Sequence, residues 1–225
     1  MSVVRRFGRL HVEDERDRNF LLTPDLKKAS GVTKRYWHAG RVLNQGSTPQ
    51  CVAYSGYKYL TAGPVRNTHL PWKPAELYKH AQAYDEWPGD DYDGSSVRGL
   101  FKYLQKAGYV SEYRWGFDLE TILSHVLTEG PLVLGSTWYS EMSTPRNGFI
   151  MPQGRAVGGH AYLIIGANRN KKRKNATERG AFRILNSWGR SWGQCGRAWM
   201  SFLDFEMLLE DRDVEACMAV EVDKD

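Results

Sequence analysis

Apolar residues recur at helical spacing in three stretches between residues 51 and 108. CVAYSGYKYL repeats apolar side chains at i, i+4 and i+7, which places them on one face of a helix. PAELYKHAQAY opens with Pro74, a residue favoured in the first turn, and SSVRGLFKYLQKAGY closes on Gly108, a residue typical of the end of a helix. The pattern therefore predicts that the first half of the chain is mainly helical.

After Gly130 the pattern changes to short runs rich in β-branched and aromatic residues, separated by Gly, Pro and Asn. These runs are PLVLGSTWY, GGHAYLIIGA, GAFRILNSWG and GRAWMSF. Helices followed by strands indicate the α+β class, in which the two kinds of element are segregated. No repeat or low-complexity linker separates them, so we expect residues 41–128 and 129–225 to share an interface in one folded unit. Residues 1–40 would form an N-terminal extension that packs across both halves.

Composition narrows the class of protein. The chain has 225 residues with 41% hydrophobic content, enough to bury a core. The opening MSVVRRFGRLHVEDERDRNF lacks the apolar run of a signal peptide, and no later window approaches the roughly 20 apolar residues of a membrane span, so we expect a cytoplasmic protein. Cys51, Cys195 and Cys217 are an odd, widely spaced set without a C-x-x-C pair. Neither a disulfide framework nor a metal site is therefore predicted.

The net charge of +5 comes from one local cluster. Five basic residues lie in RNKKRK, residues 169–174, and acidic and basic residues balance in the rest of the chain. The cluster separates the runs HAYLIIGAN and AFRILNSW, so we interpret it as the solvated tip of a hairpin. Binding of nucleic acid or another anionic partner by this loop is the less favoured alternative.

Cys51 stands where the first predicted helix begins. The dipole and free N–H groups of a helix start stabilise a thiolate, which still needs a proton acceptor and a group to orient that acceptor. His160 opens an apolar run, and Asn186 lies at the end of the next run. If these strands pair, His160 and Asn186 lie side by side and face Cys51. Gln45, six residues before the cysteine, offers an amide donor for an oxyanion.

Each of these residues also has a plainer interpretation. A free cysteine is more often a buried structural thiol, which is how we interpret Cys195 and Cys217. A histidine that opens a strand is usually structural too, and Trp192 is expected to be a core aromatic residue. His160 is favoured as the base because it alone follows two glycines and has an asparagine on the next predicted strand. The other histidines are His11, His38, His69, His80 and His125.

The blocks NQGSTPQC, GGHAYLIIG and FRILNSWGRSWG resemble the signature blocks of the papain-like cysteine peptidases, in the same chain order. The resemblance implies a helical half packed against an antiparallel, β-barrel-like half, with the active-site cleft between them. It implies that Cys51 is the nucleophile, His160 the general base and acid, and Asn186 the residue that orients the imidazole. Gln45 and the Cys51 backbone N–H would bind the oxyanion. Trp188 would shield the His160–Asn186 hydrogen bond from water.

The resemblance is to the short, disulfide-free branch of the family found in bacteria, archaea and some viruses. The leading 40 or so residues are too few for the large folded inhibitory propeptide of lysosomal relatives, so we expect no zymogen of that type. Substrate would lie along backbone groups close to the catalytic residues. The substrate-binding positions that the resemblance implies are Asp93, Gly94, Ser95, Gly158, Gly159 and Trp188.

The resemblance places the main specificity pocket between Gly158, Val97 and residues 220–222. These residues favour an open, apolar pocket with broad preference, because apolar contacts discriminate by only about 1–3 kcal/mol per methylene. A one-residue register shift would instead turn Glu221 inward and favour Arg or Lys.

The function that follows is that of a thiol endopeptidase. It would act as a monomer on a protein or peptide substrate through an acyl-enzyme, with no metal or organic cofactor. The residues around the nucleophile depart from the family: Thr48-Pro49-Gln50 precede it where a small Gly-Ser run is usual, and Val52 follows it where an aromatic residue is usual. These departures keep open a catalytically decayed binding protein on the same scaffold. A transpeptidase or amidase that uses the same triad also stays open, because the sequence does not distinguish it from a hydrolase.

Overall fold

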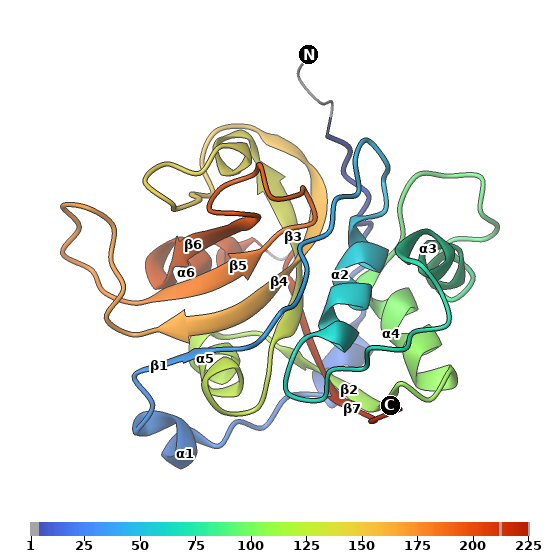
Figure 1. Ribbon diagram of the computed structural model, residues 1–225, viewed down its shortest axis with the longest axis horizontal. Coiled ribbons are helices and arrows are strands. Elements are labelled where there is room, and N and C mark those ends of the chain that lie inside the picture. The colour runs from blue at the N-terminus through green and yellow to red at the C-terminus, as the bar shows by residue number, and fades with distance from the viewer. Residues whose placement is uncertain (1–4, 212, 225) are drawn as a thin grey trace.

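The computed structural model describes residues 5–211 and 213–224. Three helices gather on one side of the molecule and most strands on the other (Figure 1). The helices are α2 (Cys51–Thr61), α3 (Pro74–Gln82) and α4 (Val97–Lys106). They coincide with the three stretches of helical spacing, and Gly108 follows α4 with a left-handed φ of 75°. The predicted α+β class is confirmed.

The strands form one mixed-length sheet in which every pairing is antiparallel. Within the described residues its order is β2-β7-β3-β4-β5-β6, and β1 pairs with β4. The strands are β1 (Lys34–Tyr36), β2 (Val110–Gly116), β3 (Leu132–Tyr139), β4 (Ala156–Asn168), β5 (Ala181–Leu185), β6 (Arg197–Ser201) and β7 (Glu215–Glu221). The four predicted β runs are β3 to β6, whereas β2 comes from the mainly helical part of the chain.

Both faces of the central strands are buried, which explains their nearly continuous apolar sequence. On β3 and β4, Leu134 and Tyr162 face the core shared with α5 (Leu119–Thr128) and α6 (Phe202–Glu210). Their neighbours Val133 and Ala161 face the core shared with α2, α3 and α4. The alternation of side chains along a strand thus joins the two sides of the molecule through one sheet.

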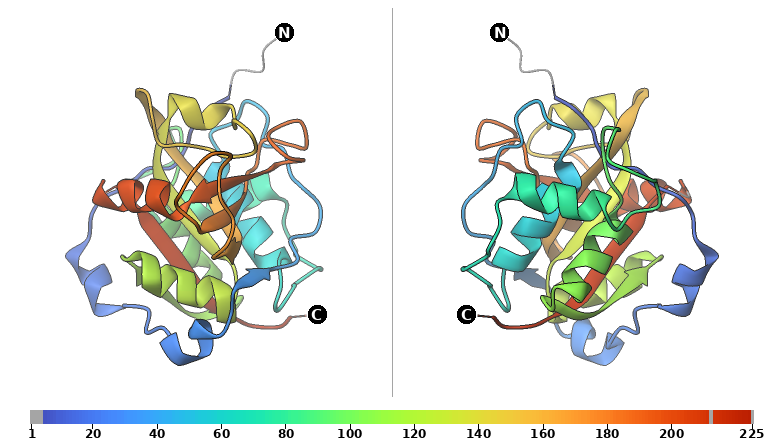
Figure 2. Two further views of the ribbon diagram at one scale, coloured as in Figure 1. Left: turned by 90° about the vertical axis from the view of Figure 1, so that its left-hand side faces the viewer. Right: turned by 90° about the vertical axis from the view of Figure 1, so that its right-hand side faces the viewer.

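The N-terminal residues do not form a domain of their own. From residue 5 the chain passes between the helices and the strands (Figure 1), and it then runs along the outside of the molecule to α1 (Leu26–Ser30), as Figure 2 shows. On the way lies the short 3-10 helix η1 (Glu15–Asn19), and a second one, η2 (Ser140–Ser143), follows β3. In the described part of the chain, no helix is both long and apolar enough to cross a membrane.

Candidate active site

Cys51 is the first residue of α2 and is completely buried. Burial raises the pKa of its thiol, although backbone hydrogen bonds with Ala161, Gly8 and Val52 act in the opposite direction. Ala161 follows His160 on β4, so the thiol lies against the strand that carries the predicted base. With the thiol out of water, the neutral form is favoured over the thiolate that a helix start alone would stabilise.

The structure brings His160 and Asn186 together. His160 Nε2 lies 2.9 Å from Asn186 Oδ1, and both side chains are buried. The same oxygen accepts a hydrogen bond from the backbone N–H of Ser187 at 2.7 Å, which identifies it as the amide oxygen. His160 Nε2 therefore carries the proton. The other ring nitrogen, Nδ1, has no hydrogen-bond partner among the described residues and is free to accept a proton.

Aromatic rings surround the imidazole. The ring of Trp188 lies 4.7 Å from that of His160 at an angle of 31°, and Trp138 packs edge-on to it at 4.8 Å. Burial lowers the pKa of His160 to about 4, despite the hydrogen bond to Asn186, so the imidazole is neutral. Sequence reasoning missed Trp138. Its position in an apolar β run indicated burial, but only the pairing of β3 with β4 places it next to His160.

The Gln45 amide is engaged by the chain itself. Its Nε2 donates to the backbone oxygens of Arg6, at 3.1 Å, and Thr48, at 2.7 Å. Its Oε1 accepts a hydrogen bond from Ser187 Oγ at 2.6 Å, which fixes the orientation of the amide. The donor that was expected to bind an oxyanion thus holds a carbonyl oxygen of the N-terminal segment, which we define as residues 5–11.

The N-terminal segment lies along the predicted substrate-binding backbone. The Arg9 N–H donates to Gly159 O at 3.1 Å, the Leu10 N–H donates to Ser95 O at 3.0 Å, and the Ser95 N–H donates to Gly8 O at 2.9 Å. The segment approaches so closely that a Cβ on Gly159 would lie 2.2 Å from Arg9 O. A stretch of the chain's own backbone therefore occupies the place where a peptide substrate was expected.

Side chains of the same segment cover the remaining predicted positions. Phe7 packs on Trp188, with ring centroids 5.9 Å apart, and its Cβ would be 2.8 Å from a Cβ added to Gly158. The guanidinium of Arg5 lies over the Trp188 ring at 4.5 Å. At the exposed rim, Arg6 pairs with Asp93 at 3.2 Å. The N-terminal segment covers the site, which sequence reasoning did not anticipate.

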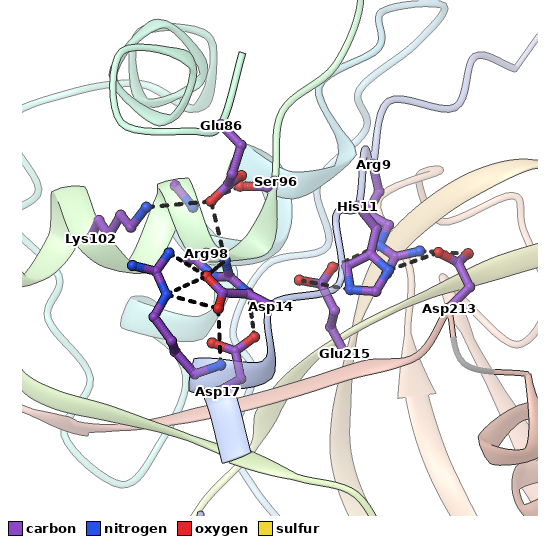
Figure 3. A network of polar contacts seen from close by, with 12 residues as sticks. Arg9, His11, Asp14, Asp17, Glu86, Ser96, Arg98, Lys102, Asp213 and Glu215 are labelled. Atoms are coloured by element: carbon purple, nitrogen blue, oxygen red, sulfur yellow. Dashed lines mark hydrogen bonds and ion pairs between the residues drawn. The ribbon is translucent and has the colours of Figure 1, made fainter. Parts of the chain in front are cut away.

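Arg9 extends into a buried acidic pocket (Figure 3). Its Nε lies 2.8 Å from Glu215 Oε2 and its Nη1 lies 2.7 Å from Asp213 Oδ2, and its side chain is only 1% exposed. Asp213 also accepts hydrogen bonds from Thr137 Oγ1 at 2.7 Å and pairs with His11 Nδ1 at 3.1 Å. Burial raises the pKa of Asp213, but the hydrogen bond with His11 and the charge of Arg9 outweigh it and bring that pKa to about 2.

The structure does not bring together the residues that were predicted to form the specificity pocket. Val97 lines the pocket that holds Arg9, but the β7 residue beside it is Glu215, because β7 pairs Glu215 with Gly135 on β3. Glu221 lies at the opposite end of β7, where it pairs with Val110. There it lines a separate cavity of about 530 Å³, and burial raises its pKa to about 8. The proposed contribution of residues 220–222 was therefore wrong, because the resemblance could not fix the register of the last strand.

Two other predicted features lie outside the site. The basic stretch 169–174 joins β4 to β5, and two of its residues form ion pairs, Arg169 with Glu120 at 3.5 Å and Arg173 with Asp204 at 3.4 Å. All three cysteines are free thiols, and of the two interpreted as structural, Cys217 is buried and Cys195 is exposed. In residues 5–211 and 213–224, no group of His, Cys, Asp and Glu is arranged to hold a metal ion.

No family model matches the chain. Cathepsin B-like CP3 from Giardia intestinalis is 30% identical over 105 residues, which make up 46% of this chain and 31% of that protein. An uncharacterized peptidase C1-like protein from Acanthamoeba polyphaga mimivirus is 22% identical over 200 residues, or 68% of this chain and 62% of that protein. The chain thus spans less than two thirds of the length of these curated relatives.

Solved structures match over nearly the whole chain. Xylellain, a cysteine protease from Xylella fastidiosa, superimposes with a TM-score of 0.74 at 18% identity and covers 97% of both chains. Digestive procathepsin L 3 from the larval midgut of Tenebrio molitor gives a TM-score of 0.66 at 14% identity, covering 97% of this chain and 77% of that chain. At these identities the likeness is one of fold.

Proposed function

We propose that this chain, whose fold is that of the papain-like cysteine peptidases, is a thiol peptidase that hydrolyses peptide bonds through an acyl-enzyme on Cys51. The resemblance of the three sequence blocks to that family is confirmed at the level of the fold. The observation that carries the proposed activity is the hydrogen bond between His160 Nε2 and Asn186 Oδ1, which leaves Nδ1 of the same ring without a partner.

The proposed reaction uses the groups that the fold holds in place. His160 Nδ1 accepts the proton of the Cys51 thiol, and the resulting thiolate attacks the carbonyl carbon of the scissile bond. Gln45 Nε2 and the Cys51 backbone N–H stabilise the oxyanion, which takes the place now held by the Arg6 carbonyl at Gln45. His160 then donates its proton to the leaving amine and removes a proton from the water that hydrolyses the acyl-enzyme.

Activity requires the N-terminal segment to leave. Cys51 and His160 are both fully buried beneath it, and burial raises the pKa of the thiol and lowers that of the imidazole, so the pair is neutral while the segment is bound. Entry of water on opening reverses both shifts and favours the thiolate and imidazolium forms. The structure described above is therefore the closed state of the proposed enzyme.

Intact-mass labelling with an epoxysuccinyl inhibitor of thiol peptidases tests the proposal. We expect a single adduct on Cys51, together with hydrolysis of small peptide amides, and we expect both to disappear in Cys51→Ser. Cys195→Ser removes an exposed thiol outside the site and is expected to change neither result. Absence of an adduct on Cys51 in the opened variant Phe7→Ala, under conditions where iodoacetamide alkylates Cys195, would favour the decayed binding protein.

A further inference from the structure

The pocket that holds Arg9 lies on the acyl side of Cys51. Gly8 contacts the thiol through its backbone, whereas Arg5 lies over Trp188, on the side where His160 packs. The imidazole delivers its proton to the leaving amine, so in the proposed function the leaving group lies on the Trp188 side. Arg9 follows Gly8 in the opposite direction, next to Ser95. Its pocket therefore faces the part of a substrate that precedes the cut.

A substrate has the same backbone partners available as the N-terminal segment. Arg9 lies between Gly159, whose carbonyl accepts its N–H, and Ser95, which bonds the residues on either side of it. An extended peptide that reaches Cys51 between Ser95 and Gly159 can form hydrogen bonds with the same backbone groups, as a strand does at the edge of a sheet. The residue held between Ser95 and Gly159 then directs its side chain into the pocket that Arg9 fills.

Gly135 makes the pocket deep enough for a long side chain. A Cβ at this position would lie 2.8 Å from Arg9 Nε and 3.2 Å from Glu215 Oε2. Gly135 is in the middle of β3 and has no left-handed φ. Glycine is therefore needed here to leave room for the Arg9 side chain, and not to allow an unusual backbone conformation. Val97 also approaches to 3.2 Å of the same point and provides an apolar wall for the stem of the side chain.

Glu215 gives the pocket its charge. Its side chain is 4% exposed, and its closest cation is Arg9, while the imidazole of His11 reaches only 4.0 Å. When the segment leaves, a buried carboxylate remains, and burial of a charge is unfavourable unless an opposite charge accompanies it. An arginine or lysine side chain restores the pair, and Asp213 at the half-exposed end accepts a second hydrogen bond from it. An apolar side chain leaves Glu215 unpaired.

We propose that the pocket of Gly135, Val97, Asp213 and Glu215 is a substrate subsite that selects Arg or Lys on the acyl side of the cut. This inference rests on the proposed function and adds its substrate class: peptides with a basic residue close before the scissile bond. Glu215 is the specificity-determining residue. The N-terminal segment fills this subsite with the side chain that the subsite selects.

Cleavage of a mixed peptide library by the full chain carrying Arg9→Ala tests the preference. Removing the Arg9 side chain empties the pocket, and we expect Arg or Lys to be enriched at least about tenfold over Leu at one position before the cut, the scale of a charge-assisted hydrogen bond. In Arg9→Ala with Glu215→Gln, we expect that enrichment to vanish while cleavage of Leu-containing peptides persists. A library profile with apolar residues enriched at that position in Arg9→Ala would overturn the inference.

Glu221→Gln is the matched control in the same Arg9→Ala background. It makes the same Glu-to-Gln change in a partly buried residue at the far end of the same strand, so we expect the Arg and Lys enrichment to remain. If the enrichment is lost in Glu221→Gln and kept in Glu215→Gln, then Glu221 determines the preference and the inference is overturned. Circular dichroism of each variant shows whether the fold is retained.

A binding measurement separates this inference from the proposed function. Fluorescence anisotropy with two labelled peptides that differ only in Arg or Leu, added to the full chain with Arg9→Ala and Cys51→Ser, reports on the subsite without catalysis. Tighter binding of the Arg peptide, by about tenfold or more, supports the subsite even if no variant hydrolyses peptides. Equal binding overturns the subsite even if Cys51 proves to be the nucleophile.

Discussion

Phe7 lies edge-on to His160, with ring centroids 5.8 Å apart and planes at 89°. The side chain of a residue near the N-terminus thus caps the imidazole of the predicted base, 153 positions away in the sequence by residue number. The cap keeps water from the imidazole and from Cys51, and it contributes to the burial that holds both groups neutral. Access to the site is therefore governed by how strongly a few N-terminal side chains bind.

Phe7→Ala is expected to expose Cys51. Loss of a partly buried ring removes about 1–2 kcal/mol of the contacts that hold the segment, so alkylation of Cys51 by iodoacetamide should become about tenfold faster. Peptide mass mapping measures this rate, with the exposed Cys195 as internal reference. Phe20→Ala, which removes an exposed phenylalanine from the same part of the chain, should leave the rate unchanged. Equal rates in wild type and Phe7→Ala would show that Phe7 does not close the site.

The two buried histidines should make the fold less stable as the pH drops from about 6.5 to 4. Burial lowers the pKa of both His160 and His125 to about 4, below the value of about 6.5 in an unfolded chain. Between these values the unfolded state binds more protons, so the free energy of unfolding decreases with decreasing pH, by about 3 kcal/mol per histidine once the pH reaches 4. Glu221, whose pKa is raised to about 8, acts in the opposite direction, so guanidinium unfolding midpoints are measured in the Glu221→Gln background, where a flat profile from pH 7 to 4 would contradict the prediction. His125→Asn should remove about half of the slope.

Asn186→Ala should lower activity less than Cys51→Ser or His160→Ala. Asn186 orients the imidazole by accepting its Nε2 proton and takes no part in bond making. A loss of about 10- to 100-fold in kcat/KM is expected, against complete loss for the other two variants. Initial rates on a small peptide amide, measured in the Phe7→Ala background, decide the order. Equal and complete losses in correctly folded variants would mean that Asn186 has another role.

Arg98 should anchor the N-terminal residues to the helices. Its buried guanidinium pairs with Asp14 and Asp17 at the start of η1, and Glu86 lies 3.8 Å away (Figure 3). Arg98→Met removes the cation that Asp14 and Asp17 share, while Arg16 still pairs with Asp14. A loss of about 1–3 kcal/mol in the free energy of unfolding is therefore expected. Limited proteolysis should then cut within the first 25 residues sooner than in wild type. Lys102→Met, which removes a more exposed partner of Glu86, is the control.

The basic loop is expected to be dispensable for catalysis. It follows β4, whose end lies eight residues beyond His160, or about 26 Å along the strand. Replacing the five basic residues of 169–174 with Ser or Gln should leave hydrolysis of a small peptide unchanged. It should abolish any salt-sensitive binding of nucleic acid, as measured by anisotropy at two salt concentrations. A large loss of hydrolysis would place the loop beside the site.

The fold could be predicted where local pattern and burial agree. α3 and α4 have one apolar face and clear Pro and Gly boundaries, and β3 to β6 are apolar runs between turn residues. β2 and β7 were harder to recognise, since VSEYRWG and EACMAVE mix exposed and buried positions without regular alternation. Their pairing with each other joins residues about a hundred positions apart, which no local pattern reports.

In the candidate site, too, the residues with a local sequence signal could be predicted, and the contacts between distant residues could not. The candidate catalytic residues could be recognised from their local sequence. Cys51 is at a predicted helix start, His160 follows two glycines, and Asn186 follows an apolar run. The contact of Arg9 with Glu215 joins residues 206 positions apart, and neither residue is unusual among its neighbours. The one local signal is Gly135, a glycine within an apolar run, which indicates that another group packs closely against the middle of β3.

The direction of the N-terminal segment has a consequence for the survival of the chain. It runs from Arg5 beside Trp188 to Arg9 beside Ser95, in a parallel bridge with that residue. A peptide that is cut in the proposed reaction runs the other way, with its amino end on the Ser95 side and its leaving amine beside Trp188. The segment therefore presents its carbonyls and amides to Cys51 in reversed order, and in the proposed function it would occupy the site without being cleaved. In the proposed function, a single chain would thus contain both the peptidase and the segment that blocks it.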